Sequence, residues 1–204
     1  MTGTTGTTGM TTGAATGRRE RKKAQTRKAL ADAALRLFTE RGFDNVGVRD
    51  VAEAADVAVT TLFKHFPTKE ALVFDEDEGK EAALVAAVHD RSADRSVLHA
   101  LRDHLAHTLM ATGKGSPEFT AFTELVESTP ALQEYMDRMW LRHEKALLAA
   151  LTAATGAPEG DVRTATLARF VMETPSLVRG HADPQKALHE VFDLLEGGWG
   201  HAAS

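Results

Sequence analysis

From residue 30 onwards the chain repeats one pattern: apolar residues recur at the spacing of a helix face, and glycine or proline interrupts them. The first of these stretches ends at Gly42, a helix stop signal that follows the basic residue Arg41. No stretch alternates apolar and polar residues as a half-buried strand would, so the sequence predicts an all-α fold. The later helices are expected over residues 69–90, 96–112, 117–127, 130–155, 160–180 and 184–197.

Residues 48–66, VRDVAEAADVAVTTLFKHF, contain two short apolar patterns with Asp56 between them. Two short helices this close in sequence must cross at a steep angle around a tight turn. Ala52 is small where the helices would approach each other, and Asp56 is a residue type that tolerates the left-handed conformation of such turns. This is the pattern of a helix-turn-helix, whose second helix enters the major groove of DNA. An ordinary helical hairpin is the alternative.

The charges of the chain are distributed unevenly. Residues 18–64 carry 11 Lys+Arg against 7 Asp+Glu, whereas residues 65–204 carry 13 against 22, within a net charge of -5. A basic N-terminal part on an acidic body suggests a local surface for a polyanion. Residues 18–28 alone hold seven basic residues and one acidic residue, which fits either a solvated helix start or a flexible arm along DNA phosphates.

Residues 1–17 are almost entirely Thr, Gly and Ala, and we expect a disordered tail there.

Several protein classes are disfavoured by the composition. The absence of Cys excludes a disulfide, a thiolate nucleophile and a Cys-based zinc site. No apolar run approaches the roughly 20 residues of a membrane-spanning helix, and the N-terminus has no apolar signal segment. We therefore expect a cytoplasmic protein with no membrane partner.

The stretch from Ala31 to Val73 closely resembles the DNA-binding domain of the tetracycline-repressor (TetR/AcrR) family. The matching segments are AALRLF, ERGFD, VRDVAEAA, TLFKHF and TKEAL, and together the stretch covers about a fifth of the chain. The resemblance implies an N-terminal three-helix DNA-binding domain with a helix-turn-helix over residues 18–67. It further implies a C-terminal helical domain for ligand binding and dimerisation over residues 68–204.

The resemblance also implies which side chains contact double-stranded DNA. Thr and Lys side chains can bind phosphates or base edges, and an aromatic ring can pack against thymine methyl groups or sugar. The expected DNA-binding residues are Arg49, Thr60, Thr61, Phe63, Lys64, His65 and Lys69.

Four positions depart from the family pattern. Asp56 replaces the usual Gly of the turn, and Phe63 replaces a frequent Tyr, so a hydroxyl contact to phosphate is lost. Ala58 and Gly47 stand where Ser or Thr commonly caps the recognition helix and the helix before it. Each missing cap weakens its helix by roughly 0.5–2 kcal/mol.

A single helix-turn-helix offers little surface for tight binding, so we expect a homodimer that reads a palindrome with half-sites about 34–36 Å apart. The resemblance places the dimer interface in the last two helices, where two copies could form a four-helix bundle. The alternative is that these apolar stripes complete the monomer core. The expected interface residues are Phe170, Leu188, Val191, Phe192 and Leu195.

The middle helices are expected to enclose a pocket for an unknown small-molecule effector, because residues 130–155 mix Met, aromatic and His side chains on one face. Such a stripe can equally be core. The expected lining residues are His104, Phe119, Phe122, Met136, Met139, Trp140 and His143.

Two further features of the chain are a pair of histidines and an acidic run. The spacing of His104 and His107, with Glu124 or His143, would suit a metal, but such spacing arises often by chance and we expect none. The acidic run 75–78 is expected to be a solvated helix face.

These features favour a ligand-responsive repressor that the effector releases from its operator, with the long helix from Lys69 transmitting the change. The alternatives are a DNA-binding protein without an effector, and a helical small-molecule-binding protein with degraded DNA readout. We expect neither an enzyme nor a cofactor, because the sequence holds no P-loop, dinucleotide glycine fingerprint, HExxH or nucleophile elbow.

Overall fold

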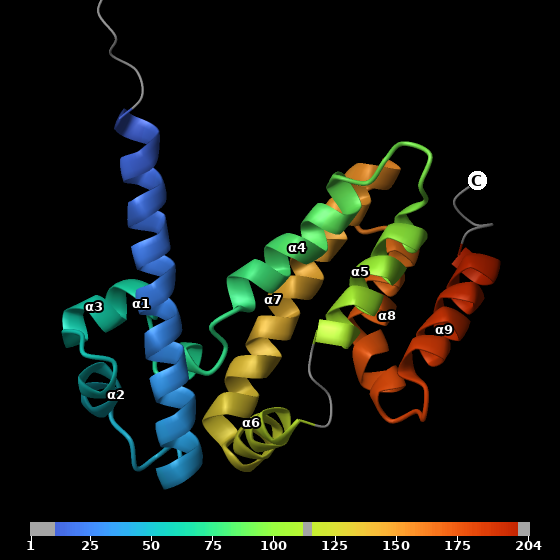
Figure 1. Ribbon diagram of the computed structural model, residues 1–204. Coiled ribbons are helices and arrows are strands. Elements are labelled where there is room, and N and C mark those ends of the chain that lie inside the picture. The colour runs from blue at the N-terminus through green and yellow to red at the C-terminus, as the bar shows by residue number, and fades with distance from the viewer. Residues whose placement is uncertain (1–10, 112–115, 200–204) are drawn as a thin grey trace, which may run out of the picture. The chain divides into compact units, whose positions relative to one another are not determined.

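The computed structural model describes residues 11–111 and 116–199. All regular secondary structure in these two stretches is helical, which confirms the all-α prediction (Figure 1). The elements are α1 (Thr11–Arg41), α2 (Val48–Ala54), α3 (Val59–His65), the 3-10 helix η1 (Glu70–Leu72), α4 (Asp77–His89), α5 (Val97–Ala111), α6 (Pro117–Ser128), α7 (Pro130–Thr155), α8 (Val162–Arg179) and α9 (Pro184–Trp199).

The residue contacts divide the chain into two compact units, residues 1–75 and residues 76–204. The division falls between Asp75 and Glu76, whereas the sequence suggested a boundary after Pro67. The reason is that η1 packs on α1, and that Ala71 and Leu72 of η1 are buried, so this segment remains with the first unit.

Apolar side chains from all four elements of the first unit share one core. The rings of Phe38 and Phe43 lie 5.0 Å apart between their centroids, at the end of α1 and just after it. Burial of this core orients α2 and α3 against α1. Its most deeply buried members are Leu30, Phe38, Val51, Leu62, Phe66 and Leu72.

The turn between α2 and α3 has the predicted conformation. Asp56 has a φ of 54°, in the left-handed region that Asp tolerates better than most residues. The Val57 N–H donates to the Ala52 carbonyl at 2.9 Å and closes the turn, and Ala52 itself is buried. The two short helices therefore form a helix-turn-helix.

The first helix begins earlier than predicted. It starts at Thr11, inside the stretch 1–17 that we expected to be disordered, while residues 1–10 lie outside the described residues. The basic segment 18–28 is consequently helical, not a flexible arm. Arg, Lys, Gln and Ala dominate residues 18–30 and are strong helix formers, which favours extension of the helix toward the N-terminus.

The single long helix predicted over residues 69–90 is wrong. The chain forms η1, then a non-helical link over residues 73–76, and then α4. Val73 and Phe74 of this link are buried, and Asp77 and Glu78 occupy the first turn of α4. Acidic residues are favoured near the positive end of a helix and repel one another inside one, so the run 75–78 starts a new helix.

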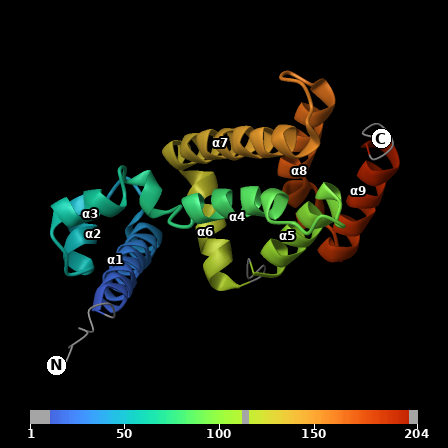
Figure 2. The ribbon, with the colours of Figure 1, turned by 90° about the horizontal axis from the view of Figure 1, so that it is seen from above.

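The second unit packs α4 on α7 and α5 on α9, while α8 lies between α7 and α9 (Figures 1 and 2). Helix α6 packs on α7. Leucines dominate the shared core of α4, α5, α7, α8 and α9, which also contains Phe192. Within residues 11–111 and 116–199, no helix is both long and apolar enough to cross a membrane.

Candidate nucleic-acid interface and ligand site

The start of α2 retains half of a capping arrangement. The Gly47 N–H donates to Asp50 Oδ2 at 2.6 Å, which is one half of a capping box; the half in which a Ser or Thr side chain accepts from a first-turn N–H is missing, because residue 47 is Gly. The recognition helix α3 also lacks a side-chain cap, because Ala58 stands at its N-cap. Helix α3 therefore depends on tertiary packing, and Leu62 and Phe66 supply it from fully buried positions.

The outer face of α3 carries most of the residues predicted to contact DNA. Thr60, Phe63 and Lys64 are exposed, and 49 % of the Phe63 surface remains accessible despite its apolar ring. Thr61 is half-buried beside them. A hydroxyl, an aromatic ring and an ammonium together suit the edges of bases, sugars and phosphates. Arg49 is exposed near the start of α2.

His65 closes α3 in a half-buried position. Its Nδ1 atom is buried and has no hydrogen-bond partner among the described residues. Burial, followed by the positive charges of Arg27 and Lys23, lowers the pKa of His65. The side chain therefore meets a ligand at neutral pH as an uncharged imidazole, not as a cation.

Lys69 directs its ammonium into the first unit. Its Nζ donates to the Phe43 carbonyl at 2.5 Å and lies 4.1 Å from the centroid of the Phe43 ring. Burial lowers the pKa of Lys69, and the carboxylates of Asp44, Glu70 and Asp50 oppose that shift. This geometry gives Lys69 an internal role, and its phosphate contact stays a prediction.

Arg27 belongs to the basic segment 18–28, but it contacts the protein itself. Its Nη1 donates to the His65 carbonyl at 2.7 Å, and its Nε and Nη2 donate to the Asp75 carbonyl at 3.1 and 2.6 Å. Its guanidinium carbon lies 4.3 Å from the centroid of the Phe66 ring. Sequence reasoning missed this role, because a basic residue in a basic run carries no signal of a specific acceptor.

The second unit buries a polar group that sequence reasoning also missed. Asp77 and His143 are both buried, with Asp77 Oδ1 2.7 Å from His143 Nε2, and Arg142 pairs with the other oxygen of Asp77. The expectation of a solvated acidic face is therefore wrong at Asp77. His143, predicted to line a ligand pocket, instead links α7 to α4, with the Trp140 ring 6.1 Å away between centroids.

The other predicted pocket residues are partly exposed. Burial, followed by the neighbouring His107, lowers the pKa of His104 on α5. In the described part of the chain, no group of three His, Asp or Glu side chains is placed to hold a metal ion. The half-buried members of the predicted set are His104, Phe119, Phe122, Met136 and Met139.

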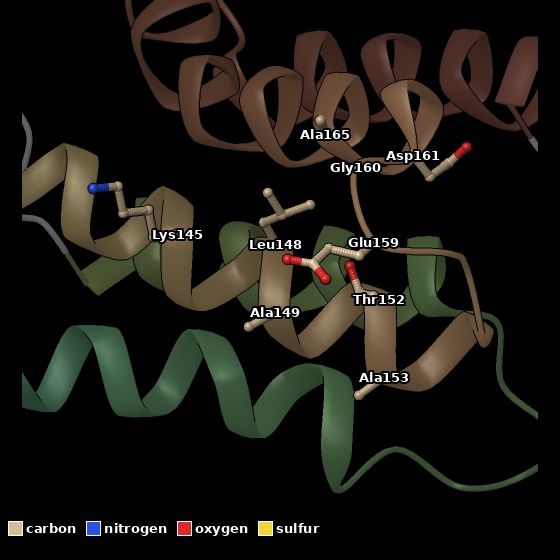
Figure 3. A pocket seen from close by; sticks show the side chains of 9 residues that line it. All are labelled: Lys145, Leu148, Ala149, Thr152, Ala153, Glu159, Gly160, Asp161 and Ala165. Atoms are coloured by element: carbon tan, nitrogen blue, oxygen red, sulfur yellow. The ribbon is translucent and has the colours of Figure 1, made fainter.

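A pocket of about 450 Å³ lies elsewhere, between α7 and the start of α8 (Figure 3). None of the predicted pocket residues lines it. Lys145 and Glu159 contribute opposite charges over a largely apolar wall, and neither side chain forms a hydrogen bond or ion pair within residues 11–111 and 116–199. The lining residues are Lys145, Leu148, Ala149, Thr152, Ala153, Glu159, Gly160, Asp161 and Ala165.

Comparison with known proteins bears on the first unit above all. Residues 30–75, which contain α2, α3, η1 and the buried part of α1, match the family described as bacterial regulatory proteins, tetR family. The likeness of this chain to the TetR family rests above all on these residues. The resemblance noted from the residues is thereby confirmed.

Two relatives and one solved structure illustrate the extent of the TetR likeness. The regulator TcmR of Streptomyces glaucescens is 33% identical over 129 residues, 60% of this chain and 57% of TcmR. The repressor KstR of Mycolicibacterium smegmatis is 42% identical over 67 residues, 33% of this chain and 32% of KstR. The structure of the SmeT–triclosan complex shares the fold, with a TM-score of 0.57, 17% identity and coverage of 84% of this chain and 90% of SmeT.

The last two helices place the residues predicted for the dimer interface in different surroundings, and the interface stays a prediction. Leu188 and Phe192 of α9 have 0% exposure, and Val191 and Leu195 pack against the same core. Only Phe170 of the predicted set is exposed, at 48%. The apolar stripe of α9 faces its own unit, because periodicity identifies a stripe without indicating which neighbour covers it. Other exposed apolar side chains on α8 and α9 are Val162, Leu177 and Leu194.

Proposed function

We propose that this chain is a DNA-binding transcriptional repressor that binds a palindromic operator as a homodimer and is released by a small-molecule effector. The observation that carries the proposal is the outer face of α3. Thr60, Phe63 and Lys64 are exposed there, while Leu62 on the opposite face is fully buried. A helix anchored in this way can enter a major groove without unfolding its own core. Since DNA is the proposed partner, we place the protein in the cytoplasm.

The proposed DNA contacts divide by chemistry. Lys64 and Arg49 would bind phosphates and supply most of the salt-dependent affinity. Thr60, Thr61 and Phe63 would contact bases and sugars, and His65 would add an uncharged hydrogen-bonding group.

Exposed apolar side chains support the homodimer. Phe170 and Leu177 lie on α8 and Leu194 lies on α9, with 48%, 56% and 77% of their surfaces exposed. Helices α8 and α9 pack on each other, so their exposed apolar side chains are candidates for a contact between protein molecules. Two copies joined through α8 and α9 would present two recognition helices to the two halves of a palindrome.

An effector site in the second unit rests on two observations. The pocket of about 450 Å³ between α7 and α8 falls within the size range of small-molecule sites. Half-buried aromatic and Met side chains on α6 and α7 offer a second place for a ligand. SmeT, which shares this fold, was solved in complex with triclosan. The proposal requires an effector that binds the DNA-free state more tightly than the DNA-bound state.

Selection of binding sequences from random duplex DNA tests the function. The winning sequence is then titrated by fluorescence anisotropy at several salt concentrations. We expect a palindrome, weaker binding as salt rises, and a salt slope that falls by about two in Lys64→Ala, one for each copy in the dimer. Phe63→Ala is expected to weaken binding at every salt concentration. Lys80→Ala, a surface change on α4 outside the proposed DNA and dimer contacts, is the control and is expected to bind normally.

Failure to enrich any sequence would contradict the proposal. A non-palindromic motif would contradict the homodimer alone. A compound screen by thermal shift tests the effector, because a ligand that binds only the folded state raises the unfolding midpoint. A hit that leaves DNA affinity unchanged at saturation would contradict release by the effector.

A further inference from the structure

We propose that Arg27 is a positioning residue: it holds the end of the recognition helix and couples that helix to the point where the chain leaves the first unit. This inference rests on the proposed DNA-binding function. It concerns a residue that lies on α1, outside the helix-turn-helix, and that composition alone would assign to a phosphate-binding surface.

One side of the guanidinium holds α3. The carbonyls in the last turn of a helix lack partners within the helix, and Arg27 Nη1 satisfies the one on His65 at 2.7 Å. The same guanidinium stacks over Phe66, the residue that caps α3, with 4.3 Å between the guanidinium carbon and the ring centroid. These contacts fix where α3 ends, and therefore how its exposed face is directed.

The other side of the guanidinium holds the exit of the chain. Nε and Nη2 both donate to the Asp75 carbonyl, at 3.1 and 2.6 Å. Asp75 is the last residue of the first unit, and α4 begins at Asp77. The guanidinium is planar and rigid. If the Asp75 carbonyl moves, the whole guanidinium moves with it, and Nη1 shifts relative to the His65 carbonyl.

Arg27→Lys separates this role from simple charge. A Lys ammonium keeps the positive charge and the helix propensity of α1, but it lacks the planar fork that reaches two carbonyls at once. Arg36→Lys is the matched control. Arg36 lies on the same helix, is exposed, and makes only a surface pair with Glu40 at 3.6 Å.

DNA titration of the full chain provides the first measurement, with the duplex obtained by selection. Arg27→Lys is expected to bind about tenfold more weakly than the wild type, because the charge-assisted hydrogen bonds that position α3 are lost. Its salt slope is expected to stay unchanged, since a positioning residue neutralises no phosphate. Unchanged affinity would overturn the proposal, and a slope lower by about two, one for each copy in the dimer, would make Arg27 a phosphate contact instead.

Amide hydrogen exchange in the DNA-free protein provides the second measurement. Arg27→Lys is expected to speed exchange in two separate segments, residues 62–66 and 73–77, whereas Arg36→Lys speeds neither. Faster exchange in one segment only, or uniformly through the first unit, would overturn the coupling. If the wild type selects no DNA sequence, the proposed function fails, while the exchange pattern still decides the role of Arg27.

Discussion

The two units of the chain use different polar contacts to hold their helices together. In the first unit, Arg27 and Lys69 donate to backbone carbonyls of distant segments. In the second, side chains pair with side chains: Asp77 with His143 between α4 and α7, and Arg169 Nη1 with Glu144 Oε2 at 2.6 Å between α8 and α7.

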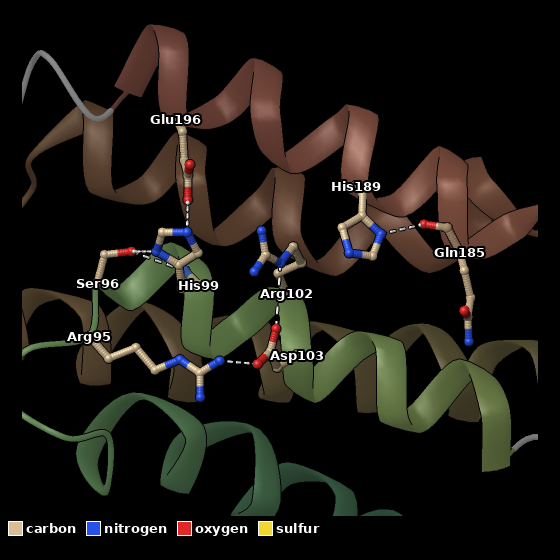
Figure 4. A network of polar contacts seen from close by, with 8 residues as sticks. All are labelled: Arg95, Ser96, His99, Arg102, Asp103, Gln185, His189 and Glu196. Carbon is tan, nitrogen blue, oxygen red and sulfur yellow. Dashed lines mark hydrogen bonds and ion pairs between the residues drawn. The ribbon is translucent and has the colours of Figure 1, made fainter.

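Contacts of α5 with α9 are a further example of side-chain pairing in the second unit (Figure 4). Ser96 Oγ lies 2.8 Å from His99 Nδ1, and His99 Nε2 lies 3.4 Å from Glu196 Oε1 on α9. A carbonyl acceptor survives any side-chain substitution, whereas a side-chain acceptor is removed by one. Substitution of a few cations is therefore expected to destabilise the first unit most. In the second unit, the stabilising contacts are distributed over paired side chains and an apolar core.

The largest expected effect tests the apolar core of the second unit. Phe192→Ala removes a fully buried ring and is expected to lower the free energy of unfolding by about 3–5 kcal/mol. Phe170→Ala is the matched control, because the same ring on α8 is exposed. We expect it to leave unfolding of the monomer almost unchanged and to weaken self-association. Urea unfolding and sedimentation velocity measure the two effects, and equal destabilisation by both variants would contradict the assignment of inner and outer faces.

The next effect tests the paired groups of the second unit. Asp77→Ala removes the hydrogen-bond partner of the buried His143, leaves Glu81 Oε2 at 3.8 Å as a weaker ion-pair partner, and is expected to cost about 2–3 kcal/mol of unfolding free energy. Asp103→Ala removes an exposed carboxylate that pairs with Arg95 and Arg102, and is expected to cost under about 0.5 kcal/mol. Urea unfolding compares them. Similar losses of unfolding free energy in the two variants would mean that the buried pair of Asp77 stabilises the unit no more than the exposed pairs of Asp103.

Sequence patterns predicted the helix ends of the second unit better than its faces. Helix α7 runs from Pro130 to Thr155 as expected, because proline favours a first turn and Gly156, with a φ of 68°, ends the helix. Periodicity could not predict that Leu188 is buried while Phe170 is exposed, because it identifies an apolar stripe but not the helix that packs on it.

Predictions for the first unit failed where distant segments meet. Residue types and family resemblance indicated the helix-turn-helix and the left-handed Asp56. They could not indicate that Arg27 contacts a carbonyl 48 positions away. The same limit applies in the second unit, where Asp77 meets a His 66 positions away. A basic run and an acidic run both look solvated until the chain brings an acceptor or donor to one member.

A smaller effect tests the internal role of Lys69. Lys69→Met keeps the length of the side chain but removes its hydrogen bond to Phe43 and the cation over the ring, at a cost of about 1 kcal/mol. The DNA salt slope is expected to equal that of the wild type. A slope lower by about two, one for each copy in the dimer, with unchanged stability, would support the phosphate contact predicted for Lys69 instead of the internal role.

The smallest effect concerns the turn between α2 and α3. Asp56→Gly is expected to stabilise the first unit by about 0.5–1 kcal/mol, because glycine adopts a positive φ without the steric cost that a Cβ atom imposes. Glycine also has more freedom in the unfolded chain, which offsets part of the gain. Gly42→Ala is the mirror control: Gly42 has a φ of 84° and is expected to lose stability on substitution. If Asp56→Gly is destabilising, the Asp56 side chain contributes more to the turn than its backbone conformation explains. The first unit would then depend on a side chain that makes no hydrogen bond to a distant segment within residues 11–111 and 116–199.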